Sequence, residues 1–299
     1  MFSQRELLVR SFVGHCQISM IRLAGASKHK RQRYHAVAHP GDVYLGATRV
    51  LKLLVGDEAA KTYDDLALMT SCVHDIIQEA EVVMGPRGFN IRQRKRGQNE
   101  ETTANWGEIQ LNELQHVYGP ASISNDEIAV VKTGTQWTIP AWDPKFMTMV
   151  QPGLWKGLAS GNWHPVPVAV AMGDLLPCGH HPETFLGSSD PLFVEEQLGM
   201  DDMLFAAAKQ SDIPPERAAT ALDVMRAWDA GQVNFALGRE KAFDYETSLL
   251  LPPQRDALRS RINKFQESAA RARWKADGRL GLNFFQYASA MGFQSVPIG

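Results

Sequence analysis

The stretch Val73-His74-Asp75-Ile76-Ile77 places an imidazole beside a carboxylate within an apolar run of helical periodicity. A polar group buried without a partner costs roughly 2–7 kcal/mol, so Asp75 needs a partner inside the fold. A divalent cation suits an adjacent imidazole and carboxylate. Two more segments supply ligand types, Tyr34-His35-Ala36-Val37-Ala38-His39 upstream and Met172-Gly173-Asp174-Leu175-Leu176 downstream. The sequence therefore predicts a metal site formed by His39, His74, Asp75 and Asp174.

The composition is that of a globular chain without a global charge signal. Of its 299 residues 44% are hydrophobic, and 31 basic residues stand against 33 acidic ones. This balance gives no strong signal for nucleic acid, and no apolar run approaches the ~20 residues of a membrane span. Three widely spaced cysteines favour a reducing compartment, and the N-terminal stretch lacks the apolar core of a signal peptide. We therefore expect a cytoplasmic protein.

Apolar residues recur at helical spacing through most of the chain. His39 precedes Pro40, which favours a helix beginning at the proline with His39 at its entry. Residues 134–167 are rich in Trp and Pro, and we interpret them as an irregular insertion or lid. The chain is expected to be all-α, one domain over 1–299 with a motif core at about 30–180 and a helical C-terminal extension at about 190–299. The predicted helices span about 4–24, 40–55, 58–83, 191–210, 214–231, 246–272 and 278–291, with another opening at Asn99.

The order His39, His74-Asp75, Asp174 resembles the ligand set of the HD-domain superfamily of metal-dependent phosphohydrolases. The stretch from Tyr34 to Val43 is similar to the Tyr-His-Asn-x-x-His-x-x-Asp-Val stretch of cyclic-nucleotide phosphodiesterases. Asn99-Glu100-Glu101 with Ala104 resembles a segment of a branch of predicted HD hydrolases. The resemblance covers about residues 30–180 and implies an HD-domain helical bundle.

Two departures from these patterns bear on the expected chemistry. Position 36 is Ala where the phosphodiesterases have Asn, and the segment 130–134 lacks the histidine that binuclear HD enzymes often place before the final Asp. We therefore expect one tightly held divalent ion, alone or with a second, loosely held one, and the ligand types allow it to be Mn, Fe, Zn, Ni or Mg.

The resemblance also implies roles around the metal. His35 corresponds to the proton donor of the phosphodiesterases, and we expect Glu101, or its neighbour Glu100, to orient a ligand or a water of the site. The same two glutamates equally suit the first turn of an ordinary helix. Residues 92–96 form a short basic run, in which we expect Arg92, Arg94 and Lys95 to pair with phosphate oxygens. The predicted function is hydrolysis of a nucleotide or another small phosphate ester, and a homo-oligomer is compatible with the C-terminal helices.

Three alternatives remain open at this point. His39-Pro40 and the stretch from His74 to Glu79 resemble (p)ppGpp hydrolases, although Gln78-Glu79 replaces their Glu-Asp pair. HD-fold di-iron oxygenases need six metal ligands, including further histidines, and only four ligands can be placed in this sequence. A non-catalytic helical module with a structural metal is the third. For His164, His180 and His181 we expect surface or structural roles.

Overall fold

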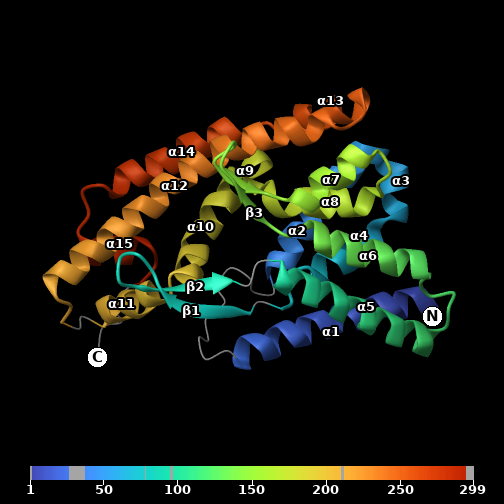
Figure 1. Ribbon diagram of the computed structural model, residues 1–299, viewed down its shortest axis with the longest axis horizontal. Coiled ribbons are helices and arrows are strands. Elements are labelled where there is room, and N and C mark those ends of the chain that lie inside the picture. Colours follow the sequence, from blue (N-terminus) through green and yellow to red (C-terminus); the bar gives the residue numbers. More distant parts are fainter. Residues whose placement is uncertain (1, 27–37, 78, 95–96, 210–211, 294–299) are drawn as a thin grey trace.

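The computed structural model describes residues 2–26, 38–77, 79–94, 97–209 and 212–293. Over these residues the chain forms fifteen helices and two small antiparallel sheets of two strands each (Figure 1). The predicted all-α class is confirmed. Within the described part of the chain, no helix combines the length and the apolar character that crossing a membrane requires.

The N-terminal part is a bundle around one helix that is apolar up to its last turn. Helix α8 begins at Pro165, whose missing N–H costs nothing in a first turn, and the His164 ring accepts the N–H of Val166. Its residues from Val166 to Gly173 are all buried, as expected of a helix that is apolar on every side. The bundle comprises α1 (Gln4–Ala26), α2 (Ala38–Val55), α3 (Asp57–Thr62), α4 (Asp64–Val73), α5 (Gln98–Tyr118), α6 (Asn125–Trp137), α7 (Pro152–Ser160) and α8 (Pro165–Leu175).

The single helix expected over 58–83 is wrong. The chain leaves α4 after Val73 and continues as the hairpin of β1 (Ala80–Met84) and β2 (Asn90–Arg94). The β-branched pair in β1 favours a strand, and the turn between the strands contains Gly88 with a positive φ of 73°. Pairing with the second strand of the hairpin, rather than helical periodicity, determines the secondary structure of this segment. The basic run therefore lies partly in a strand instead of a loop.

The Trp/Pro-rich segment is also more regular than expected. After α6 it forms a second hairpin from β3 (Ala141–Asp143) and β4 (Thr148–Val150), followed by α7. Trp137, Trp155 and Trp163 pack against the main core, whereas Trp142 is half exposed. The tryptophans therefore contribute mainly to packing.

The C-terminal helices differ from the prediction in their boundaries. Helix α12 continues through residues 232–245, where no helix was expected, and the helix expected over 246–272 is divided between the end of α12, α13 and α14. Gly238 lets the β3–β4 turn pack closely on α12, because a Cβ there would lie 2.5 Å from the carbonyl oxygen of Phe146. The helices are α9 (Pro177–His180), α10 (Pro182–Glu196), α11 (Leu198–Ala208), α12 (Pro215–Ser248), α13 (Pro252–Arg261), α14 (Phe265–Arg279) and α15 (Phe284–Ala290).

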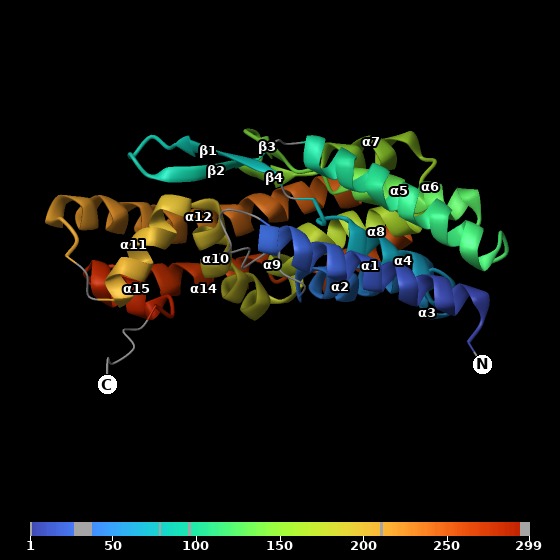
Figure 2. The same cartoon turned by 90° about the horizontal axis from the view of Figure 1, so that it is seen from below.

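Two hydrophobic clusters lie along the elongated molecule (Figure 2). The larger one fills the bundle and extends to α12, α13 and α14. The smaller one joins α10, α11, α12 and α15, and Phe89 from the β1–β2 turn packs into it. The first hairpin thus packs on the C-terminal helices, and Figures 1 and 2 both show it beside α11.

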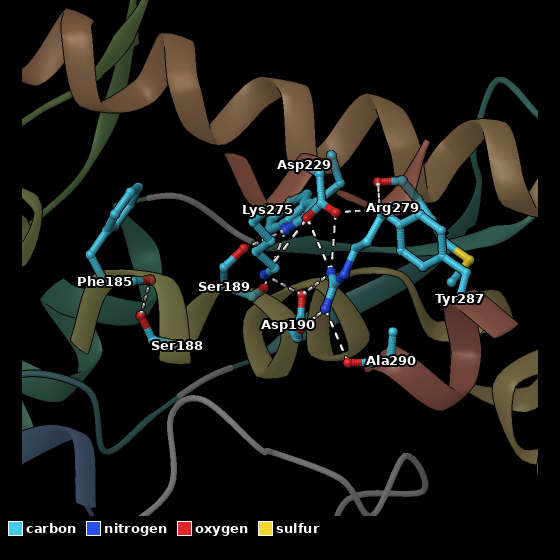
Figure 3. Close-up of polar contacts among 11 residues, drawn as sticks. Phe185, Ser188, Ser189, Asp190, Asp229, Lys275, Arg279, Tyr287 and Ala290 are labelled. Carbon is cyan, nitrogen blue, oxygen red and sulfur yellow. Dashed lines mark hydrogen bonds and ion pairs between the residues drawn. The ribbon is translucent and has the colours of Figure 1, made fainter. Parts of the chain in front are cut away.

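A charged network ties the C-terminal helices together (Figure 3). The Arg279 guanidinium pairs with Asp190 of α10 at 2.9 Å and with Asp229 of α12 at 3.1 Å. Lys275 also reaches Asp190, at 2.8 Å, and the Tyr287 hydroxyl donates to Asp229. Two carboxylates and two cations balance in this mostly buried position, which is the condition for tolerating charge there. The network therefore fixes the packing of α10, α12, α14 and α15.

Candidate metal centre

The four predicted ligands come from three helices that pack against one another. His39 lies in the first turn of α2, His74 caps the C-terminal end of α4 with Asp75 next to it, and Asp174 lies in the last turn of α8. The expectation that His39 precedes its helix is wrong, since α2 begins at Ala38. Pro40 is tolerated inside the first turn because the N–H groups there have no intrahelical acceptor.

Helices α2 and α8 cross at backbone contact. A Cβ on Gly46 would lie 3.0 Å from the Cα of Gly173, and a Cβ on Gly173 would lie 2.7 Å from the nitrogen of Ala47. The two helix backbones can lie this close because both positions are glycine. Because Gly173 immediately precedes Asp174, the crossing brings that carboxylate against the helix that carries His39.

The ligand atoms of the four side chains converge. One atom from each residue lies within 4.8 Å of the others. The Nε2 atom of His39 is 3.2 Å from Asp75 Oδ2 and 3.4 Å from Asp174 Oδ1. The Nε2 atom of His74 is 3.1 Å from Asp75 Oδ2 and 3.3 Å from the Nε2 of His39. The structure therefore brings together all four residues predicted as metal ligands.

The local backbone orients His74. Its Nδ1 lies 2.7 Å from the carbonyl oxygen of Ser71, and because a carbonyl only accepts, Nδ1 carries the hydrogen. The lone pair of the neutral ring is then on Nε2, which faces the cluster. A backbone hydrogen bond of this kind is the usual way in which proteins orient a metal-ligating histidine.

Electrostatics in the cluster favour positive charge. Burial alone would lower the pKa of His39, but hydrogen bonds and Coulombic attraction from Asp174 and Asp75 outweigh it and raise this pKa to about 10. Burial opposes protonation of His74 as well, yet Asp75 and Asp174 raise its pKa above the usual value. Two carboxylates whose side chains are only 12% and 15% exposed thus create a site that attracts cations.

The residues fit a divalent cation. Two imidazole nitrogens and two carboxylate oxygens form a mixed donor set that suits Mn²⁺, Fe²⁺, Zn²⁺ or Ni²⁺. Two ring nitrogens only 3.3 Å apart repel when both are protonated, and a cation between them removes this repulsion while serving all four donors. The cluster therefore has the composition and the proximity of a metal-binding group, as predicted for these four residues.

Gln151, which the sequence reasoning missed, supports Asp174. Its side chain is fully buried between β4 and α7, and its Nε2 donates to Asp174 Oδ2 at 3.1 Å. Its Oε1 is buried and has no hydrogen-bond partner among the described residues. An unused acceptor next to a metal-ligand carboxylate suits a site that holds water or substrate. No sequence signal marks this glutamine, because its partner lies in another helix.

The first turn of α5 braces the chain that follows the His-Asp doublet. Thr103 Oγ1 accepts the N–H of Ile77 at 3.1 Å, and the Asn99 side chain donates to the carbonyl of Glu79 at 2.7 Å. Glu100 is buried and accepts the N–H of Gly97 as part of a helix cap. Glu101 is exposed and is not one of the four residues whose ligand atoms converge, so its predicted role at the site stays a prediction.

The residues predicted to contact phosphate have different placements. Arg92 of β2 pairs with the buried Glu195 of α10 at 2.7 Å, which ties the first hairpin to the C-terminal helices. This contact gives Arg92 a structural role that the sequence analysis did not anticipate. Three other predictions, the side chain of Arg94, Lys95 and the proton donor His35, lie outside the described residues.

No protein-family model matches the chain, and searches of curated proteins and of solved structures give no significant match.

Proposed function

We propose that this protein is a metal-dependent phosphohydrolase of the HD type that acts on a nucleotide or another small phosphate ester. The observation that carries the proposal is the convergence of His39, His74, Asp75 and Asp174 within 4.8 Å. These are the residues on which the sequence resemblance rests.

The four side chains would hold one divalent cation. When bound, such an ion supplies Lewis-acid stabilisation of charge on a phosphoryl group and lowers the pKa of water toward ~7. The chain itself keeps the donors in place. Ser71 fixes the tautomer of His74, Gln151 holds one oxygen of Asp174, and the glycine crossing sets the spacing between α2 and α8.

The remaining chemistry is assigned by resemblance. His35 would donate a proton to the leaving oxygen, and Arg94 and Lys95 would attract the phosphate group. The ion pair with Glu195 argues that Arg92 instead anchors the hairpin. Substrate identity is left to experiment, since a fold alone does not specify it.

The test is product analysis by chromatography after incubation with a panel of nucleotides and phosphodiesters in Mn²⁺. Asp75→Asn removes one ligand charge with little change in shape, and Asp202→Asn changes an exposed carboxylate of α11 as the matched control. We expect turnover by the native protein and by Asp202→Asn, and none by Asp75→Asn.

Two results would contradict the proposal. One is silence across the panel from native protein shown to hold Mn²⁺. The other is equal turnover by Asp75→Asn. Oxygen consumption in place of phosphate-ester cleavage would favour the di-iron oxygenase alternative.

A further inference from the structure

A cavity lies away from the metal cluster, and we call it the α2–α9 cavity. It encloses about 320 Å³, a size typical of small-molecule sites. It lies about 15 Å along α2 from His39, at 1.5 Å per residue. None of its lining residues belongs to the metal cluster. They are Arg49, Lys52 and Leu53 of α2, His180 and His181 at the end of α9, and Arg261 at the end of α13.

The cavity carries an excess of positive charge. Among the described residues, no ion pair joins Arg49, Lys52 or Arg261 to a carboxylate. Lys264 adds to the positive field felt by both histidines, while the nearest acidic influences, Glu183 and Asp42, act on His181 alone. Glu183 is itself bound to Arg271 at 2.5 Å. Three permanent cations around one cavity repel one another until an anion neutralises them.

The two histidines are neutral donors in this arrangement. A single Arg49 nitrogen, Nη1, donates to His180 Nδ1 at 3.0 Å and to His181 Nε2 at 2.7 Å. Each ring therefore carries its hydrogen on the other nitrogen. Burial, followed by the charges of Arg49 and Lys264, lowers the pKa of His180 to about 3, which keeps the ring neutral.

The orphan donor is on His180. Its side chain belongs to a residue that is only 9% exposed, and its Nε2 has no hydrogen-bond partner among the described residues. The cationic rim of the cavity, which no described carboxylate neutralises by an ion pair, is the feature that points to an anion.

We propose that the α2–α9 cavity binds a small, multiply charged anion of the phosphate class at a site separate from the metal centre. Arginine forks pair with phosphate oxygens in bidentate fashion, Lys52 adds a point charge, and the exposed His181 offers a neutral N–H donor. A monocarboxylate would leave most of these donors unused. The proposal does not depend on the hydrolase assignment, since it involves none of the metal ligands.

The test is isothermal titration of the metal-free full chain with sodium pyrophosphate, and in a second arm with a nucleoside triphosphate. Lys52→Gln and Arg261→Gln each remove one exposed cation of the cavity, and Arg273→Gln removes an exposed arginine of α14 as the matched control. We expect each cavity variant to bind at least tenfold more weakly than the native chain and Arg273→Gln to bind like it. Tighter binding of the nucleotide would place a base or sugar in the cavity as well, and equal binding would identify the phosphates as the whole ligand.

Asp75→Asn separates this proposal from the hydrolase proposal. We expect this variant to keep its pyrophosphate affinity even where it has lost metal and turnover. The proposal is overturned if the native chain binds no pyrophosphate at millimolar concentration, if Lys52→Gln and Arg261→Gln bind as tightly as native, or if Asp75→Asn abolishes binding. Thermal unfolding of each variant shows that it is folded.

Discussion

The glycine crossing of α2 and α8 makes the metal site sensitive to a single methyl group. In Gly173→Ala the new Cβ would lie 2.7 Å from the nitrogen of Ala47 and 2.8 Å from the carbonyl oxygen of Val43, whereas ordinary contact begins near 3.4 Å. Both neighbours are backbone atoms, so no side chain can turn away. The helices must separate by about 0.7 Å, which exceeds the ~0.2 Å latitude of metal–ligand distances.

Two effects follow from that separation. Overpacking costs about 3 kcal/mol here, at the upper end of the usual range because backbone must move, and better helix propensity returns about 1 kcal/mol. We therefore expect Gly173→Ala to lose about 2 kcal/mol in urea unfolding and at least tenfold in Mn²⁺ affinity by titration calorimetry. The affinity falls because Asp174 moves with α8 away from His39.

The same helices provide graded controls. Gly46→Ala meets Gly173 at 3.0 Å and should be affected less, while Gly41→Ala, whose Cβ would have nothing within 4 Å, should be unchanged or up to about 1 kcal/mol more stable. If Gly173→Ala unfolds and binds Mn²⁺ like Gly41→Ala, the crossing does not position Asp174 and the reasoning fails.

Three further predictions concern residues around the two candidate sites. Arg92→Met removes the 2.7 Å ion pair with the buried Glu195, so urea unfolding should show a loss of about 3 kcal/mol with Mn²⁺ affinity unchanged. Native stability with lost turnover would instead support phosphate binding by Arg92. Gln151→Leu removes the N–H donated to Asp174 and should weaken Mn²⁺ binding about tenfold, whereas an unaltered affinity would remove Gln151 from the site. The folded pKa of His180 is lowered to about 3, so between pH 3 and 6.5 this ring is protonated only in the unfolded chain, and the free energy of unfolding falls as the pH drops below 6.5. At pH 4.5 the native chain should have lost about 2–3 kcal/mol more of its free energy of unfolding than His180→Gln has. Parallel pH profiles of the two proteins would count against the neutral buried ring.

Elements with strong local signals were predictable from the sequence. The spacing of Leu8, Phe12, Cys16 and Met20 marks a helix, and α1 spans Gln4–Ala26 with these four side chains buried. The His-Asp doublet and the two flanking ligands could be found because imidazoles and carboxylates in apolar surroundings require a partner. The structure brings all four together.

The predictions that failed concern segments whose structure depends on pairing with another element. The apolar residues after Asp75 continue a helical rhythm, yet Val82 pairs with Arg92 across a hairpin, which periodicity does not encode. Ending α4 at Val73 also matters for the site. Neighbouring side chains inside a helix point in different directions, whereas here His74 and Asp75 reach the same point, 3.1 Å apart.

The residues that support the site could not be predicted from the sequence either. Gln151 donates a hydrogen bond to Asp174 from the segment between β4 and α7. Arg92 forms an ion pair with Glu195, which lies in a helix outside the motif core. The α2–α9 cavity combines residues from three separate helices, so His180 and His181 alone gave no sign of an anion site. Side-chain partners of this kind appear only when the helices are assembled.

The most direct test of the metal centre is titration calorimetry of Mn²⁺ into the metal-free full chain, comparing native protein with Asp174→Asn and with the control Asp202→Asn. The isosteric change at Asp174 removes one ligand charge from the cluster and nearly keeps the side-chain volume. We predict tight uptake by the native chain and by Asp202→Asn, and a loss of that tight binding in Asp174→Asn. Absence of uptake by the native chain, or equal affinity in Asp174→Asn, would contradict the account.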